Sequence, residues 1–121
     1  MPDIKGHILV IDDEAEACEF IKSFLEERSY SVITALNGHS GIESIKNNKP
    51  ALVFLDMRMP DITGLEVLSK LKEDNITAKI ILMTAIDEEA EIEKAKQLGA
   101  IGIIKKPVQL QELSATVKQN V

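Results

Sequence analysis

The sequence lacks the features of a disulfide-stapled or membrane-embedded protein. Its 121 residues include one cysteine, Cys18, which excludes an internal disulfide and is compatible with a reducing compartment. No apolar run approaches the length that a helix needs to cross a bilayer, and the N-terminus has no signal-peptide core. We therefore expect a cytoplasmic protein that makes no contact with a membrane.

Positive charge is also scarce. Lysine and arginine together number 14 and the acidic residues number 20, which gives a net charge of −6. Non-specific binding to nucleic acid needs a basic face, as does binding to an anionic membrane, so we expect no direct contact with nucleic acid. The two histidines, His7 and His39, are far apart in the sequence and have no neighbouring metal ligands. We interpret both as ordinary polar residues.

What the chain does have is enough apolar material for a core. Hydrophobic residues make up 45% of the sequence, and its length fits one domain of ordinary size. There is no internal repeat, linker or low-complexity segment. Cys18 lies on the apolar stripe of a predicted helix, so we expect a core residue rather than a reactive thiol. The prediction is a single domain over residues 1–121.

Five apolar segments have the length of β-strands. The segment 52–55 is apolar throughout, which is typical of a strand that is buried on both faces of a sheet. The expected strands are 7–11, 30–36, 52–55, 79–83 and 101–104. The expected helices, where apolar residues recur at helical spacing, are about 12–28, about 39–47, a segment capped by Thr63, a segment from Asp87 to Gly99, and about 109–118. This alternation predicts an α/β fold with a parallel sheet and helices on both faces.

Local signals refine the predicted helices. Thr63, with Glu66 three residues later, forms a capping-box pattern, and Asn37-Gly38 before the second helix is a turn signal. The apolar stripe of the fourth helix is thin, so we expect that helix to be among the less firmly held elements. The residues expected on the inner face of the third helix are Leu65, Leu68 and Leu71.

Polar residues directly follow four of the predicted strands. Parallel strands end at one edge of their sheet, and open α/β sheets bind ligands at the carboxyl ends of the strands. We therefore expect three acids, a hydroxyl and an ammonium group to meet at this edge. They belong to Asp12, Asp13, Asp56, Thr84 and Lys106.

This set of side chains points to a divalent cation and to phosphoryl chemistry. Clustered carboxylates repel one another unless a proton or a cation neutralises them. Carboxylate oxygens without nearby His or Cys ligands favour Mg²⁺ or Mn²⁺ over zinc, and Mg²⁺ leaves a position for a phosphoryl oxygen. With the metal and Lys106 balancing the charge, a carboxylate can act as nucleophile and form an acyl phosphate. Asp56 is the best candidate, because it ends the central apolar strand.

Four separated motifs stand in a distinctive order along the chain. They are Asp12-Asp13, Asp56-Met57-Arg58-Met59-Pro60 with Gly64 beyond, Thr84-Ala85, and Lys106-Pro107. Together they resemble, over the whole chain, the receiver domain of two-component response regulators, the CheY-like superfamily. The resemblance implies a flavodoxin-like, doubly wound (βα)5 fold whose five-stranded parallel sheet has the order 2-1-3-4-5. It also implies a signalling domain that catalyses only its own phosphoryl transfer and dephosphorylation, not an enzyme in its own right.

The resemblance assigns a phosphoacceptor and a metal site. Asp56 would accept the phosphoryl group. Asp13 and Asp56 would be direct ligands of Mg²⁺, and Asp12 would hold the waters of the metal. The backbone carbonyl of Arg58 would complete the protein's share of the metal shell.

The same resemblance assigns the phosphoryl contacts and the partners. Thr84 would hydrogen-bond the phosphoryl group, Lys106 would pair with one of its oxygens, and the Lys106–Pro107 bond would be cis. A sensor histidine kinase or a histidine phosphotransfer domain would donate the phosphoryl group. A downstream effector domain or protein would respond to a change in the surface that extends from strand 79–83 through the last helix.

Two positions depart from the pattern of that family. Ile103 stands where many members have a Tyr or Phe that rotates as a switch, and Val108 stands where Phe is frequent. The part of the switch that depends on Thr84 can remain, but an aromatic flip cannot. We therefore expect the mode of output to differ from the usual one.

Three other classes of protein fit parts of the pattern. A hydrolase with an aspartyl nucleophile, such as a phosphatase, would need a second aspartate two residues after Asp56, where Arg58 stands. A flavodoxin-like nucleotide or flavin binder would need a phosphate loop rich in glycine or hydroxyls after the first strand, where the acidic run 12–14 stands. A pseudo-receiver that only binds partners would not need the intact acidic set and Lys106.

Overall fold

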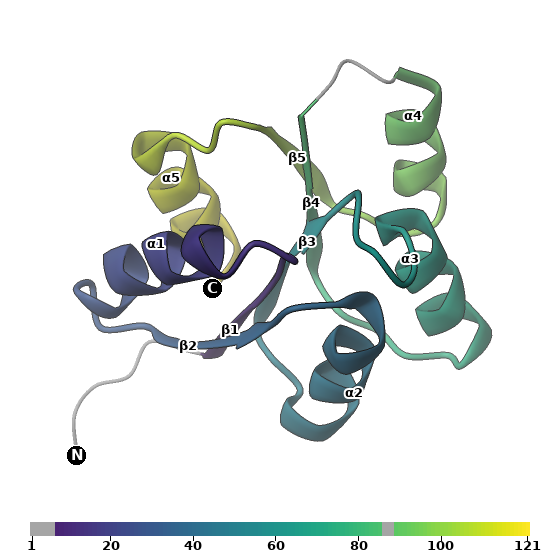
Figure 1. Ribbon diagram of the computed structural model, residues 1–121, viewed down its shortest axis with the longest axis horizontal. Helices are drawn as coiled ribbons and strands as arrows, with labels where there is room; N and C mark the ends of the chain where they lie inside the picture. Colours follow the sequence, from purple (N-terminus) through teal and green to yellow (C-terminus); the bar gives the residue numbers. More distant parts are fainter. Residues whose placement is uncertain (1–6, 86–88) are drawn as a thin grey trace.

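The structure is a computed structural model that describes residues 7–85 and 89–121. In these residues, parallel strands form one sheet with the order β2-β1-β3-β4-β5, and helices cover both of its faces (Figure 1). The strands are β1 (His7–Ile11), β2 (Ser31–Ala35), β3 (Leu52–Asp56), β4 (Ile80–Thr84) and β5 (Gly102–Lys105). The helices are α1 (Ala15–Glu26), α2 (Gly38–Asn48), α3 (Gly64–Glu73), α4 (Glu89–Gln97) and α5 (Leu110–Asn120). The predicted α/β fold and strand order are confirmed.

The helices form two layers with the sheet between them. In Figure 1, α1 and α5 lie on one side of the sheet, and α2, α3 and α4 lie on the other. Alternate residues of the central strands point to opposite layers, so Phe54 packs with α1 and α5 while Leu55 packs with the other three helices. Both faces of β1, β3 and β4 are covered, which explains why the residues 8–11, 52–55 and 80–83 of these strands are all apolar.

Cys18 belongs to the layer of α1 and α5, where its side chain is buried in the core. Burial, together with the nearby charge of Asp12, raises the pKa of the Cys18 thiol to about 11. A thiol with such a pKa stays protonated at neutral pH and is a poor nucleophile. The prediction of a core residue is confirmed.

The strand register brings the carboxyl ends of the strands to one edge. Ile11, the last residue of β1, lies beside Leu55 of β3. Thr84, the last residue of β4, lies beside Lys105, the last residue of β5. Asp56 ends β3 between these two pairs. The residues that directly follow the strands therefore emerge at the same edge, as the sequence predicts.

Side chains cap the N-termini of α3 and α2. The capping box of α3 is present: the Glu66 N–H donates to Thr63 Oγ1 at 3.2 Å, and the Thr63 N–H donates to Glu66 Oε1 at 3.2 Å. The turn signal at Asn37-Gly38 coincides with a bend at Leu36 and Asn37, and α2 follows directly, with Asn37 as its N-cap and Gly38 as its first residue. The side chain of Asn37 accepts the N–H of Ser40 at 2.9 Å, so an Asx-type signal here begins a helix. The predicted cap Asp87 lies outside the described residues.

The helix α4 is held by little apolar contact, as predicted. Ala95 is its one buried residue within 89–97. Gly99 follows the helix with φ of 109°, a left-handed conformation that favours glycine after a helix. On α3, Val67 is fully buried, whereas Leu65 is only partly buried. None of the described helices could cross a membrane, and the longest of them, α1, has 12 residues.

Gly64 lets α3 start directly against the end of β3. A Cβ at this position would lie 2.8 Å from the backbone oxygen of Asp56 and 3.1 Å from Cα of Met57. We expect Gly64→Ala to lower the free energy of unfolding by about 1–3 kcal/mol, because backbone atoms cannot move aside as a flexible side chain can. Urea denaturation monitored by circular dichroism measures the loss.

The matched control is Gly102→Ala. A Cβ there would meet only the end of the Ile81 side chain, at 3.0 Å, which can rotate away. An equal loss of stability in the two variants would contradict the close approach at Gly64.

Candidate functional site

Three carboxylates meet at the carboxyl edge of the sheet. Asp12 and Asp13 follow β1, Asp56 ends β3, and these two strands are neighbours. A carboxylate oxygen from each of the three lies within 4.8 Å of the others. Asp12 and Asp56 are 1% and 6% exposed, and Asp13 is exposed. The predicted acidic cluster therefore forms, with two of its members removed from solvent.

Lys106 places an ammonium group against the two buried acids. Its Nζ lies 3.0 Å from Asp56 Oδ1 and 3.1 Å from Asp12 Oδ2. The backbone N–H of Lys106 donates to the carbonyl oxygen of Thr84 at 2.7 Å, which ties the end of β5 to the end of β4. The Lys106–Pro107 bond is cis, as predicted. One cation thus faces two of the three carboxylates.

The electrostatics of this group are dominated by burial and by mutual charge. Burial raises the pKa of Asp56, the hydrogen bond from Lys106 opposes this rise, and the charges of Asp12 and Asp13 add to it. For Lys106, burial by itself would lower the pKa, but the hydrogen bond and charge of Asp56, with the charge of Asp12, raise it overall. Lys106 therefore stays charged, and its single positive charge faces a cluster of three carboxyl groups.

The donor set fits a hard divalent cation. The cluster is the one group of metal-ligating side chains found within residues 7–85 and 89–121, and it consists of aspartates alone. Carboxylate oxygens suit Mg²⁺ and Mn²⁺, whereas zinc prefers nitrogen and sulfur. Both oxygens of Asp12 already accept hydrogen bonds, Oδ1 from the Glu14 N–H at 3.0 Å and Oδ2 from Lys106. Asp13 and Asp56 are therefore better placed than Asp12 to contact a metal directly.

The two remaining predicted site residues lie at the same edge. Thr84 is 2% exposed and ends β4, the strand next to β3. Arg58 follows Asp56 by two residues, and its guanidinium Nη2 lies 3.7 Å from Glu91 Oε1 on α4. The role of the Arg58 carbonyl as a metal ligand stays a prediction.

A groove adjoins the acidic cluster between α1 and the segment after β5. It has a volume of about 420 Å³, and its lining includes Asp12 and Lys106 together with the apolar residues Phe20, Pro107 and Val108. The side chain of Phe20 is half exposed. The acids can therefore be approached from this side along a mainly apolar surface.

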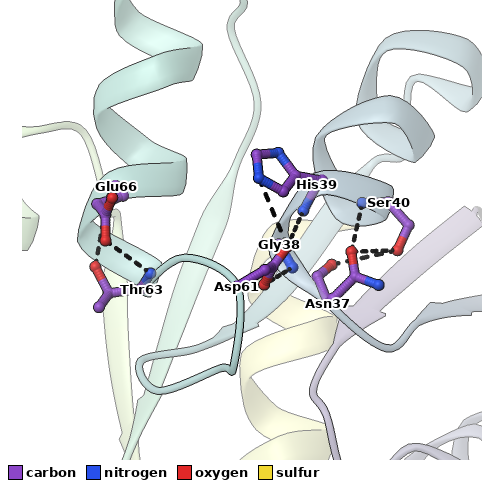
Figure 2. Close-up of polar contacts among 7 residues, drawn as sticks. All are labelled: Asn37, Gly38, His39, Ser40, Asp61, Thr63 and Glu66. Carbon is purple, nitrogen blue, oxygen red and sulfur yellow. Dashed lines mark hydrogen bonds and ion pairs between the residues drawn. The ribbon is translucent and has the colours of Figure 1, made fainter.

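Asp61 is a residue of this region that the sequence analysis missed. Its Oδ1 accepts the N–H of Gly38 and its Oδ2 accepts the N–H of His39, each at 2.9 Å (Figure 2). His39 Nε2 lies 3.9 Å from the same Oδ2. Partial burial would raise the pKa of Asp61, but the backbone N–H groups of His39 and Gly38 lower it to about 2. No local signal indicated this contact, because its partners precede Asp61 by more than 20 residues.

Comparisons with known proteins agree with this arrangement. The sequence matches the family described as response regulator receiver domain over residues 8–118. The alkaline phosphatase synthesis transcriptional regulatory protein PhoP of Bacillus subtilis is 35% identical over 111 residues, which cover 92% of this chain and 46% of that protein. Sporulation initiation phosphotransferase F of the same organism is 30% identical over 112 residues, which cover 93% of this chain and 90% of that protein. The chain spans about half the length of the first curated relatives that it matches.

Solved structures show the same fold. A two-component response regulator from Clostridium difficile has a TM-score of 0.87 at 35% identity and is covered over 93% of each chain. The chemotaxis protein CheY4 of Vibrio cholerae has a TM-score of 0.87 at 21% identity, with 95% of this chain and 98% of that chain covered. The second likeness concerns the fold alone.

The shared ammonium group predicts how the pKa of Asp56 responds to loss of Lys106. We expect Lys106→Met to raise that pKa further, because burial and the charge of Asp12 remain while the opposing hydrogen bond is lost. Since the folded-state pKa already exceeds the ordinary value of 3.8, the contribution of Asp56 to stability falls as the pH rises through this range. The variant should lose stability more steeply with rising pH.

A carboxyl-carbon NMR titration of Asp56, combined with urea denaturation at several pH values, measures both effects. Lys105→Met at the exposed neighbouring position is the control. An Asp56 pKa that is unchanged or lower in Lys106→Met would contradict the ion pair.

Proposed function

Because this chain belongs to the response regulator receiver domain family, we propose that Asp56 accepts a phosphoryl group from a phosphohistidine. Members of the family are signalling domains of two-component systems, and the donor would be a histidine kinase or a histidine phosphotransfer domain. The observation that carries the proposal is the meeting of Asp13, Asp56 and Lys106 at one edge of the sheet. This chain supplies a carboxylate nucleophile, a pair of acids that could bind a metal ion, and an ammonium group that could contact the phosphoryl group.

The reaction is a transfer between two nucleophiles at phosphorus. A carboxylate oxygen of Asp56 attacks the phosphorus atom, the bond between phosphorus and the imidazole nitrogen breaks, and the histidine leaves with the electron pair and takes up a proton. The product on this chain is an acyl phosphate. In the later dephosphorylation step a water attacks phosphorus, the bond between phosphorus and the Asp56 oxygen breaks, and the Asp56 carboxylate is regenerated as inorganic phosphate leaves with the protons of the water.

The chain's own residues supply the electrostatics of these steps. Lys106 lowers the pKa of Asp56 relative to what burial alone would give, which favours the ionised nucleophile. When the phosphoryl group arrives, the ammonium group of Lys106 and the hydroxyl of Thr84 can contact its oxygens. Asp13, Asp56 and the Arg58 carbonyl would hold Mg²⁺, with Asp12 binding its waters, and the ion would supply further positive charge for the phosphoryl oxygens. Burial of Asp12 and Asp56 limits competing water at the nucleophile.

The surroundings of the site support partners on two sides. The groove beside Lys106, which is lined in part by the half-exposed Phe20, offers an apolar approach for the protein that carries the phosphohistidine. On the other side, Thr84 ends β4, and α4 after it is held by the single buried residue Ala95 among those described. We propose that a phosphoryl group contacted by Thr84 shifts this loosely held region and so alters the surface of β4, α4, β5 and α5 for an effector.

Ile103 shapes this output. It is partly buried and packs against the core cluster on the side of α2, α3 and α4. An aliphatic side chain at this position cannot rotate between a buried and an exposed aromatic state. The response of the surface therefore has to pass through the backbone and packing around Thr84.

Asp56→Asn provides the first test of the proposal. Incubation of the unsubstituted protein with Mg²⁺ and acetyl phosphate should add one labile phosphoryl group, and the variant should add none because its amide is not a nucleophile. Intact-mass spectrometry measures the product. Asp74→Asn, at the C-cap of α3, is a matched acid-to-amide control and should be phosphorylated normally. Equal phosphorylation of Asp56→Asn would reject Asp56 as the acceptor.

A second prediction concerns the metal. Asp13→Ala should weaken Mg²⁺ binding on the order of tenfold or more, because it removes a direct charged ligand. Isothermal titration with Mg²⁺ measures the affinity, and Asp74→Ala serves as the control. Unchanged affinity in Asp13→Ala would exclude Asp13 as a ligand.

A further inference from the structure

The segment between β3 and α3 contains Arg58, whose carbonyl is the proposed metal ligand. This segment is anchored first at Met57. The Met57 N–H donates to the carbonyl oxygen of Met83 on β4 at 3.0 Å. The Met57 carbonyl accepts the N–H of Gly64 at 2.8 Å. Met57 is itself buried. The segment therefore leaves β3 from a fixed point.

The second anchor is Asp61. Its carboxylate accepts two consecutive backbone N–H groups in the first turn of α2, those of Gly38 and His39, each at 2.9 Å (Figure 2). These hydrogen bonds join a charged carboxylate to the positive end of a helix, and such charge-assisted bonds are stronger than hydrogen bonds between uncharged groups. The next residue, Ile62, packs so closely on α2 that a Cβ at Gly38 would lie 2.3 Å from its Cγ1.

The helix that receives Asp61 is itself firmly placed. Its residues Ile42 and Ile45 are buried in the core. A Cβ at Gly41 would lie 2.6 Å from the Ile11 side chain of β1, so the helix sits directly on the strand that precedes the acids. Asp61 is thus bound to a helix that packs directly on Ile11, the residue before the acidic pair Asp12-Asp13.

We propose that Asp61 is a positioning residue for the metal site: by holding the segment after Met57 to α2, it fixes the three residues between the anchors and with them the Arg58 carbonyl. The inference rests on the proposed function, since it assumes that this carbonyl is a ligand. Outer groups that orient a ligand typically contribute a factor of ten to one hundred in metal affinity. Without the tie from Asp61, the residues that follow Met57 would have more conformational freedom to lose when the metal binds, which weakens binding.

If Asp61 served only to cap α2, its contacts with that helix would be the same, but its loss would not affect the metal site. Asn37 already caps α2, because its side chain accepts the N–H of Ser40 at 2.9 Å (Figure 2). Both Asn37 and Asp61 satisfy N–H groups of the same turn, and of these two only Asp61 links that turn to the segment after β3. Asn37→Ala is therefore a matched control that removes a cap of α2 without removing the link.

The experiment compares Asp61→Ala, Asp61→Asn and Asn37→Ala with the unsubstituted protein. Amide hydrogen exchange of the non-proline residues within 58–62, measured without metal, reports the order of the segment, and a Mg²⁺ titration reports the affinity. We expect Asp61→Ala to speed exchange in this segment and to weaken Mg²⁺ binding on the order of tenfold. Asp61→Asn keeps one acceptor oxygen and should lie between. Asn37→Ala should leave both quantities unchanged while lowering the stability of the protein.

Two results would overturn the proposal. In one, Asp61→Ala behaves like the unsubstituted protein in exchange or in Mg²⁺ affinity. In the other, Asn37→Ala changes both quantities as much as Asp61→Ala does, which would mean that loss of helix capping is the cause. Either result leaves the proposed function intact, because phosphorylation of Asp56 and its loss in Asp56→Asn are measured separately.

Discussion

One ammonium group shared by two buried carboxylates is the interaction on which the chemistry of this fold depends. The Nζ of Lys106 lies 3.0 Å from Asp56 and 3.1 Å from Asp12, and these acids are almost wholly removed from water. Without that cation, two ionised acids could not remain buried side by side. With it, the cluster still has more negative than positive charge once Asp13 is included. That residual negative charge attracts a divalent cation, whose charge could in turn balance that of a phosphoryl group.

The fold supplies this arrangement through the order of its strands. Since β1 and β3 are neighbours, the acids that follow them are brought together, and since β5 lies beyond β4, Lys106 reaches the acids across the end of β4. These positions could be predicted from the sequence, because each polar residue directly follows an apolar strand and parallel strands end at one edge. The predicted partner of Lys106 is a phosphoryl oxygen, whereas its contacts in the structure are the two carboxylates that such an oxygen would approach.

Other features could not be predicted because their causes are not local. Asp61 reads as a turn residue after a proline, and only the folded chain shows that it binds the first turn of α2. Asn37 is a different case, because its contact is local: its side chain caps α2 through the N–H of Ser40, and an Asn-Gly pair is also a turn signal. On α3, helical spacing identified the buried residues Leu68 and Leu71 but missed Val67, which packs beside Gly38 of another helix. The contacts of Asp61 and Val67 join segments that are far apart in the sequence.

One pocket carries the proposed function: Asp56 as acceptor, Asp13 beside it in the acidic cluster, and Lys106 facing Asp56 and Asp12. The most direct test is a crystal structure of the protein with Mg²⁺ and beryllium trifluoride, a stable mimic of a phosphoryl group on a carboxylate. We expect beryllium bonded to a carboxylate oxygen of Asp56, Mg²⁺ in contact with Asp13, and the ammonium group of Lys106 in contact with a fluorine. Beryllium bound to another side chain, or Mg²⁺ held away from Asp13 and Asp56, would contradict the proposed function.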